Sequence, residues 1–246
     1  MADVAAAGNA TEIAEAIVQA GAHGKTLCIR GGGSKLKLLG RDCLADILDV
    51  SANRGIVDYQ PRELVVTAHA GTTIAELSTI LAAEGQMLAS EPPHFDGRGT
   101  LGGTLASNLS GPARPWGGSL RDALLGIGLV NGKGEVLNFG GRVMKNVAGY
   151  DVSRLQAGAL GTLGVITELS LKVMPLPESV LTLVHRLEAS TALQLMNERA
   201  GRPAPLTGAC WVNGKLYLRL AGAASAVEET AATWGGDRLA DDDNFW

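Results

Sequence analysis

The sequence predicts an α+β protein built from two unlike regions, and three observations lead to this prediction. Segments with helical spacing of apolar residues alternate with short apolar runs of strand length along the chain of 246 residues. The 33 glycines gather in separate loops up to Gly164 and become sparse after Pro175. Beyond Pro175 the expected elements follow the order strand, helix, strand, strand, helix. We therefore expect one domain over residues 1–175 and a second over residues 176–246.

Composition excludes several classes of protein. Glycine is abundant, but no Gly-X-Y period indicates collagen, and a hydrophobic fraction of 46% excludes a flexible linker. The 21 basic and 25 acidic residues give a net charge of −4, which offers no electrostatic case for nucleic-acid binding. Cys28, Cys43 and Cys210 lie far apart without a CxxC pair. We therefore expect no disulfide framework, structural zinc or iron–sulfur cluster in this chain.

The sequence lacks the patterns of a secretion signal and of a membrane span. Its beginning holds Asp3 and Glu12 where a signal peptide has a basic and then an apolar stretch. No run of residues approaches the ~20 apolar residues of a membrane-spanning helix. We expect a cytoplasmic protein.

The first part of the chain is predicted to alternate helices and strands. Apolar residues recur at helical spacing over residues 10–20, where Asn9 and Glu12 resemble a capping box and Gly21 suits the helix end. Four short strands and a second helix, capped by Thr72 or Thr73, are expected next. The strands are Thr26–Ile29, Asp46–Val50, Ile56–Tyr59 and Leu64–Ala68, and the helix runs from Thr73 to Ala83.

Residues 92–118 are rich in proline and glycine, which predicts a long structureless loop of functional importance. A hairpin follows, in which Asn131–Gly134 turns one strand into the next. Its strands are Ala123–Val130 and Val136–Phe139, and a further strand is expected at Val165–Val173.

The residues after Pro175 predict most of a ferredoxin-like unit, in the order βαββα. Apolar Phe245 and Trp246 have the character of the beginning of another element. The expected elements are Val180–Leu187, Ser190–Arg199, Thr207–Asn213, Lys215–Leu220 and Ser225–Trp234.

The glycine loops do not fit the familiar nucleotide-binding motifs. No GxxxxGK[ST] sequence exists, which excludes a Walker-type site. A GxGxxG match at residues 97–102 follows Pro92–Phe95 rather than a buried strand, so a Rossmann fold is rejected. Gly158, Gly161 and Gly164 have the spacing of a helix-packing seam, but the strand after them favours a loop.

Four glycine loops remain to be explained, at residues 30–35, 70–73, 99–111 and 158–164. They lie in the segments RGGGSK, VTAHAGTT, TLGGTLASNLSG and GYDVSRLQAGALGTLGVIT. In this order the segments resemble the FAD-binding fold of the vanillyl-alcohol-oxidase family, called PCMH-type, over about residues 10–175. Residues 110–151 are similar to the FAD-binding subunits of bacterial glycolate oxidases within that family.

The resemblance implies a two-lobed PCMH-type FAD-binding domain over residues 1–175. It also implies a partial, truncated ferredoxin-like cap over residues 176–246, because relatives continue beyond Trp246. The FAD is expected to be non-covalent, since the loop at 30–35 has no histidine, and to be held mainly by backbone amides. The implied cofactor-binding residues are Arg30, Gly31, Gly32, Gly33, Ser34, Lys35, Gly99, Thr100, Gly102, Gly103, Asn108, Ser110, Gly111, Gly161, Thr162, Gly164, Val165 and Ile166.

The sequence leaves the roles of several residues open. Val165 and Ile166 are equally good core strand residues. Lys145–Asp151 is either a turn capped by Asp151 or a latch around the cofactor or a subunit contact. His94 suits a polar loop position better than a ligand, base or tether. No catalytic residue is identified and no metal site is expected.

The resemblance implies an FAD-dependent oxidoreductase subunit that acts on glycolate, D-lactate or another 2-hydroxy acid. Its expected partners are a paralogous flavin subunit and an iron–sulfur subunit, through which it would associate with a membrane. A self-sufficient FAD-dependent 2-hydroxy-acid dehydrogenase is disfavoured because the chain offers no identified base or carboxylate-binding cation. A binding-only scaffold subunit is disfavoured because the glycine loops are intact.

Overall fold

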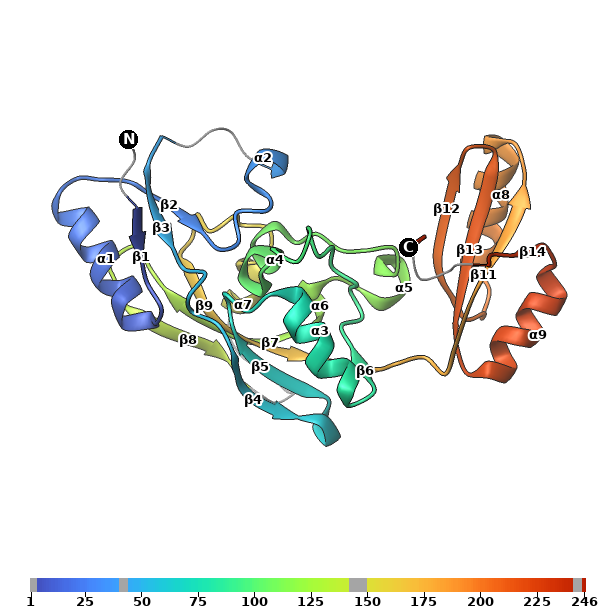
Figure 1. The fold of residues 1–246 in the computed structure, drawn as a ribbon, viewed down its shortest axis with the longest axis horizontal. Coiled ribbons are helices and arrows are strands. Elements are labelled where there is room, and N and C mark those ends of the chain that lie inside the picture. The colour runs from blue at the N-terminus through green and yellow to red at the C-terminus, as the bar shows by residue number, and fades with distance from the viewer. Residues whose placement is uncertain (1–3, 40–43, 142–149, 241–244) are drawn as a thin grey trace. The chain divides into compact units, whose positions relative to one another are not determined.

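The computed structural model describes residues 4–39, 44–141, 150–240 and 245–246 (Figure 1). The chain divides into two compact units. Unit 1 contains Met1–Gly111 and Gly118–Met174, and unit 2 contains Pro112–Gly117 and Pro175–Trp246. Domain boundaries at residue 175 stay a prediction. The units differ from the predicted division at Pro112–Gly117 and at Pro175, which were assigned to the first domain and belong to unit 2.

A five-stranded antiparallel sheet supports the larger core of unit 1 (Figure 1). Its strand order is β4-β5-β9-β7-β8. Apolar side chains of three helices complete this core, among them Leu77, Leu105 and Leu120. The strands are β4 (Ile56–Gln60), β5 (Val65–His69), β7 (Leu124–Val130), β8 (Val136–Gly140) and β9 (Val165–Lys172), and the helices are α3 (Ile74–Ala83), α4 (Leu101–Ser107) and α6 (Leu120–Ala123).

A three-stranded parallel sheet forms the second lobe of unit 1, in the order β1-β3-β2. Its own core joins Ile13 of the first helix and Leu48 to Val130 and Val165 at the ends of β7 and β9. The helix begins after Asn9, whose Oδ1 accepts from the Glu12 N–H at 3.0 Å, and it continues one residue past the predicted stop. These elements are β1 (Val4–Ala6), α1 (Ala10–Ala22), β2 (Leu27–Arg30) and β3 (Asp46–Asp49).

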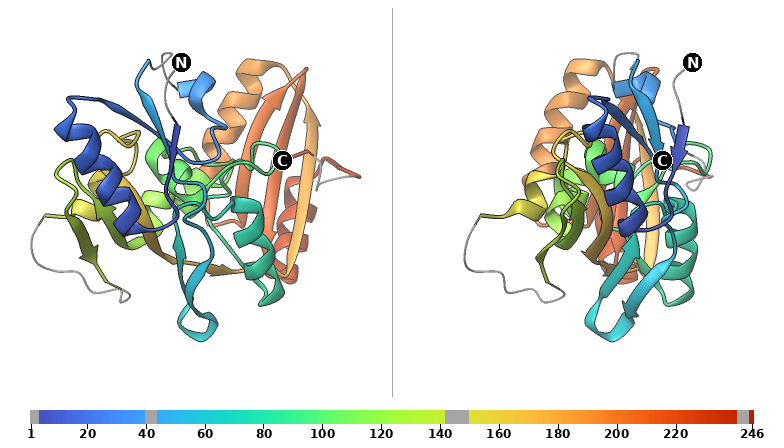
Figure 2. Two further views of the ribbon diagram at one scale, coloured as in Figure 1. Left: turned by 60° about the vertical axis from the view of Figure 1, so that its left-hand side comes forward. Right: turned by 90° about the vertical axis from the view of Figure 1, so that its left-hand side faces the viewer.

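Unit 2 contains a four-stranded antiparallel sheet of order β12-β13-β11-β14, and the chain after Pro175 adds the helices α8 and α9 to it (Figure 2). The two-residue strand β14 gives the order βαββαβ and was not expected from the sequence. Phe245 stacks on Tyr217 at 4.1 Å, and Trp246 Nε1 donates to Thr182 Oγ1 at 2.8 Å. The elements are β11 (Ser179–Arg186), α8 (Ala189–Ala200), β12 (Leu206–Val212), β13 (Lys215–Gly222), α9 (Ala224–Trp234) and β14 (Asp237–Arg238).

The prediction of a structureless loop over residues 92–118 is wrong. This segment contains α4 and a further short helix, α5 (Arg114–Gly117). Leu101 and Leu105 of α4 are fully buried, and burial of this apolar pair offsets the low helix propensity of Gly102 and Gly103. Proline and glycine content alone therefore gave the wrong structure for this segment.

The helices and strands predicted elsewhere are present, with ends displaced by one or two residues. Thr73 caps α3, since its side chain accepts from the Glu76 N–H at 3.1 Å. Among the residues that the structure describes, no helix combines the length and the apolar character needed to cross a bilayer. The short elements that the sequence did not predict are β1, α2 (Leu36–Leu39), the 3-10 helix η1 (Pro61–Glu63), β6 (Gln86–Met87), α6, α7 (Val152–Leu155), β10 (Met174–Pro175) and β14.

Candidate functional site

The loop after β2 meets the loop before α4 backbone to backbone. A Cβ atom at Gly31 would lie 2.7 Å from Thr100 Oγ1, and one at Gly32 would overlap the carbonyl oxygen of Arg98. Any side chain at these two glycines would separate the loops. Two segments far apart in the sequence are thus brought together by residues that the sequence predicted as cofactor-binding.

The loop at 70–73 holds the beginning of α4 in place. Gly102 N–H donates to the Ala70 carbonyl at 2.8 Å, and Leu101 N–H donates to the Thr72 carbonyl at 2.8 Å. Thr100 caps the helix, since its Oγ1 accepts from Gly103 N–H at 3.3 Å, and this side chain is almost fully buried. The Thr100 hydroxyl therefore has a structural role in α4.

The loop at 158–164 packs along the same helix. Gly158 N–H donates to the Leu105 carbonyl at 3.0 Å and Leu160 N–H donates to the Ala106 carbonyl at 2.9 Å. Gly161 has φ +76°, and a Cβ there would lie 3.7 Å from Ile29 of β2. Residues 30–35, 99–111 and 158–164 therefore gather around α4 and the end of β2, and we name them the loop cluster.

Backbone N–H groups are left unpaired in the first of these loops. Within the described part of the chain, the five successive N–H groups of Gly31–Lys35 donate to no protein acceptor. The five residues are half-buried, and Gly33 has φ +64°. Successive free N–H groups in a turn form a concave site for an anion.

Two cations flank these N–H groups, and they differ in their partners. Arg30 Nη2 binds Asp49 Oδ2 at 2.8 Å, which balances its charge. Burial of Asp49 works to raise its pKa, but hydrogen bonds from Ser51 and Arg30 lower it below the ordinary value. Lys35 Nζ lies 4.7 Å from the centre of the Phe95 ring and forms no ion pair with any described residue. Burial lowers the pKa of Lys35, so an anionic ligand would restore its preference for the charged form.

Four polar oxygens near α4 are buried and have no hydrogen-bond partner among the described residues. Two of them, Asn108 Oδ1 and Ser110 Oγ, belong to predicted site residues, and two, Ser90 Oγ and Gln156 Oε1, do not. Leaving such an atom unpaired costs about 1–3 kcal/mol each. This part of the structure therefore fits a polar ligand. The signal that could have revealed Gln156 is a glutamine inside an otherwise apolar and glycine-rich segment.

Most of the remaining predicted site residues have contacts within the protein that account for them without a ligand. The Thr162 hydroxyl is exposed and donates to the Ala159 carbonyl at 2.7 Å. Val165 and Ile166 are buried in the two cores of unit 1, so their side chains serve the fold. Ser34 is half-buried. Close approach or special geometry accounts for the glycines Gly99 (N–H to the His94 carbonyl), Gly103 (beside Lys35 Nζ), Gly111 (against Glu91) and Gly164 (φ +151°).

Two of the open roles can be addressed from the structure. Asp151 caps α7, because its Oδ1 accepts from Arg154 N–H at 2.9 Å, as the capped-turn interpretation expects. Of the other predicted latch residues, Lys145–Gly149 lie outside the described residues, and Tyr150 is fully exposed. His94 is an exposed loop residue, and its carbonyl accepts from Gly99 N–H at 2.9 Å.

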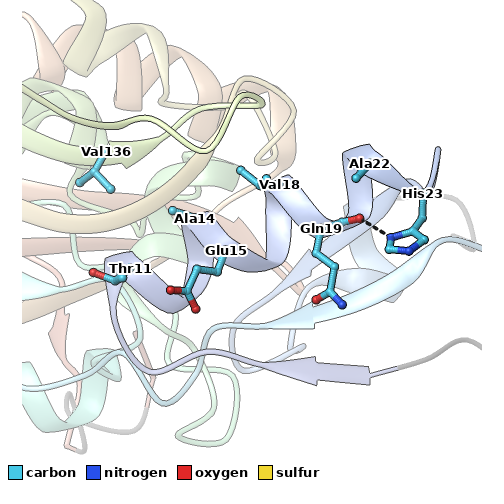
Figure 3. A pocket seen from close by; sticks show the side chains of 8 residues that line it. All are labelled: Thr11, Ala14, Glu15, Val18, Gln19, Ala22, His23 and Val136. Atoms are coloured by element: carbon cyan, nitrogen blue, oxygen red, sulfur yellow. Dashed lines mark hydrogen bonds between the residues drawn. The ribbon is translucent and has the colours of Figure 1, made fainter.

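A hollow of about 450 Å³ lies elsewhere in unit 1, along α1 and Val136 (Figure 3). Its lining is mostly apolar, and His23 Nδ1 is bonded to the Gln19 carbonyl at 2.7 Å. None of the predicted site residues lines it. Across the described ranges, no group of three or more His, Cys, Asp or Glu side chains could hold a metal ion.

The loops at 30–35 and 99–111 lie within a region of the chain that matches a family model. The model described as "FAD binding domain" matches residues 2–140. The chain belongs to this family. FAD is therefore the cofactor of the domain, as the loop segments predicted. The loop cluster fits this FAD-binding family, because the unpaired N–H groups suit a phosphate and the unpaired oxygens suit donors of a nucleotide.

Curated relatives include two glycolate oxidase subunits and a D-lactate dehydrogenase. The glycolate oxidase subunit GlcE of Escherichia coli is 43% identical over 94% of this chain and 65% of its own length. The glycolate oxidase subunit GlcD of Bacillus subtilis is 29% identical over 73% of this chain and 38% of its own length. The D-lactate dehydrogenase of Anaerostipes hadrus is 36% identical over 52% of this chain and 27% of its own length. This chain thus spans less than two thirds of the length of each of these relatives.

Solved structures confirm the predicted fold class. Two crystal forms of alkyldihydroxyacetonephosphate synthase match with a TM-score of 0.74 at 19% and 18% identity. The match covers 94% of this chain and 49% and 50% of those chains. At this identity the likeness shows the fold alone.

Proposed function

We propose that this chain is the FAD-binding subunit of an enzyme complex that oxidises glycolate or a related 2-hydroxy acid. The observation that carries the proposal is the row of N–H groups at Gly31–Lys35 that donate to no described acceptor, together with the Lys35 ammonium, which forms no ion pair with any described residue. The choice of substrate class rests on the 43% identity to the E. coli glycolate oxidase subunit.

In this proposal different residues of the loop cluster bind different parts of FAD. The N–H groups of Gly31–Lys35 and the Lys35 ammonium bind the pyrophosphate, while the charge of Arg30 stays balanced by Asp49. Asn108 Oδ1 and Ser110 Oγ accept hydrogen bonds from the cofactor. The loop at 30–35 contains no histidine to which a flavin could be attached, so the cofactor is held without a covalent bond.

Bound FAD would supply the hydride acceptor for oxidation of the hydroxy acid. A base for the hydroxyl proton and a cation for the substrate carboxylate are also required, and we assign neither to this chain. We therefore infer partners of the kind the sequence suggested, a paralogous flavin subunit and an iron–sulfur subunit that takes up the electrons. Location in the cytoplasm, with membrane association through such partners, belongs to the same proposal.

Flavin content of the purified chain tests the cofactor part of the proposal. The protein should be yellow or become so with added FAD, and denaturation should release free flavin into the supernatant. Flavin that stays with the denatured chain would refute non-covalent binding. A chain that takes up no FAD at all would refute the proposed function.

Anaerobic reduction of the bound flavin tests the subunit assignment. We expect glycolate or D-lactate to bleach the flavin absorbance when the partner subunits are present and not with the chain alone. Bleaching of the isolated chain would instead support the self-sufficient dehydrogenase. FAD binding without bleaching in the complete complex would support the scaffold alternative.

A further inference from the structure

Ser90 and Gln156 are buried residues that the sequence did not mark as part of the site. Their side chains are 2% and 3% exposed, and Ser90 Oγ and Gln156 Oε1 have no hydrogen-bond partner among the described residues. Buried polar atoms normally find partners, so each of these needs an explanation.

Both residues connect directly to the predicted binding residues of the loop cluster. The Ser90 carbonyl accepts from Gly111 N–H at 2.8 Å, one residue after Ser110. Gln156 lies two residues before Gly158, where a Cβ would lie 3.8 Å from Asn108 Cβ. The four unpaired oxygens therefore belong to segments that pack against one another at the end of α4.

Buried amides and hydroxyls elsewhere in the described part of unit 1, such as those of Gln86 and Ser170, have hydrogen-bond partners. Gln86 Oε1 accepts from the Tyr59 hydroxyl at 2.9 Å and Gln86 Nε2 donates to the Pro61 carbonyl at 2.8 Å. Ser170 Oγ is paired with Thr67 Oγ1 at 2.9 Å. Gln86 and Ser170 thus pair their side chains within the fold, whereas the oxygens of Ser90, Asn108, Ser110 and Gln156 have no partner among the described residues.

The chemistry of the unpaired atoms indicates what they bind. All four are neutral oxygens of hydroxyl or amide groups, and each can accept a hydrogen bond. They complement a neutral ligand part that carries O–H or N–H donors, in contrast to the cationic and N–H-rich loop at Gly31–Lys35. FAD offers such donors in its sugar hydroxyls, its ring N–H and its adenine amino group.

We propose that Ser90 and Gln156 are additional FAD-binding residues, which accept hydrogen bonds from a neutral, donor-bearing part of the cofactor outside the pyrophosphate. This inference rests on the proposed function. It adds two residues from segments before α4 and after α7 to a site otherwise formed by the glycine loops.

The test compares four variants of the full chain by FAD titration and by thermal unfolding without FAD. In Gln156→Leu and Ser90→Ala, each lost hydrogen bond to FAD should weaken FAD binding by about three- to tenfold. The melting temperature of the apoprotein should stay the same or rise, since no bond within the protein is lost. The matched controls Gln86→Leu and Ser170→Ala should show the reverse, a lower melting temperature with unchanged FAD affinity.

Titrations with ADP and FMN then identify the part of FAD that is bound. Weaker binding of either fragment to Gln156→Leu supports the proposal and assigns the contact to that half of the cofactor. Unchanged affinity of Gln156→Leu and Ser90→Ala for FAD would overturn it, while the proposed function would stand if the wild-type chain binds FAD. Failure of the wild-type chain to bind FAD would overturn both.

Discussion

Glycines of unit 1 and unit 2 serve different purposes. In unit 1, a Cβ at Gly32 would overlap the Arg98 carbonyl, and one at Gly102 would lie 2.7 Å from Ala70 Cβ. In unit 2, Gly214 and Gly235 have open space around them and only a positive φ, as turns require. Several glycines of unit 1 therefore let separate loops touch, whereas Gly214 and Gly235 of unit 2 only turn or end an element.

Polar groups without partners in the described part of the chain, beside close backbone contacts, mark the candidate cofactor site of unit 1. Among the described residues, the N–H groups of Gly31–Lys35 and oxygens such as Asn108 Oδ1 have no hydrogen-bond partner. A fold that needed stability alone would pair these groups. Substitutions in each unit test whether this difference between the two units is real.

The largest effect is expected for Gly32→Ala. The added methyl would force the Arg98 loop away, which should destabilise unit 1 by about 3 kcal/mol, at the upper end for overpacked sites, and abolish FAD binding. Gly132→Ala is the control, because nothing lies within 4 Å of its Cβ position. Chemical unfolding and FAD titration of both variants measure the difference. Equal behaviour of the two would contradict the close contact of the loops.

Lys35→Met should weaken FAD binding by about 10- to 100-fold, the value of a hydrogen bond to a charged group. Folding stability should hardly change, since Lys35 has no ion pair to lose among the described residues. Lys133→Met, in the exposed turn of the β7–β8 hairpin, is the matched control. FAD titration at low and high salt is the measurement, and a variant with wild-type affinity would remove Lys35 from the site.

Asn9→Ala should lower the free energy of unfolding by about 1 kcal/mol, because α1 loses its N-cap hydrogen bond to Glu12. The corresponding residue of α8 in unit 2, Glu188, makes no side-chain cap bond, so Glu188→Ala should change little. Denaturant titration of both variants tests this. A larger loss for Glu188→Ala would show that the capping assignment is wrong.

The smallest effect concerns pH and unit 2. Burial, with a contribution from Arg199, lowers the pKa of His185 from its ordinary value of 6.5, while Asp237 opposes the shift. The folded state therefore binds a proton less readily than the unfolded chain. Its stability should be complete above about pH 6.5 and decline as the pH falls below that value. In His185→Gln this part of the loss of folding stability should be absent from unfolding curves recorded at pH 6.5 and at lower pH.

Local sequence signals predicted much of the fold, since Asn9 with Glu12 fixed the beginning of α1 and Asn131–Gly134 the hairpin turn. These signals failed where tertiary contacts determine the local structure. In α4 the low helix propensity of the glycines is offset by the burial of Leu101 and Leu105. The order of strands across the sheets had no local signal. Likewise the glycines predicted the position of the loop cluster. That Ser90 Oγ and Gln156 Oε1 have no hydrogen-bond partner among the described residues depends on the residues packed around them in the folded chain.

Amide hydrogen exchange with and without FAD tests the central claim most directly. The N–H groups of Gly31–Lys35 have no acceptor among the described residues, so they should exchange rapidly in the apoprotein and slowly once FAD is bound. Protection should extend through residues 99–111 and 158–164 and be absent from the turn at Gly214. Bound FAD with unchanged exchange at Gly31–Lys35 would contradict the assignment of this loop to the cofactor.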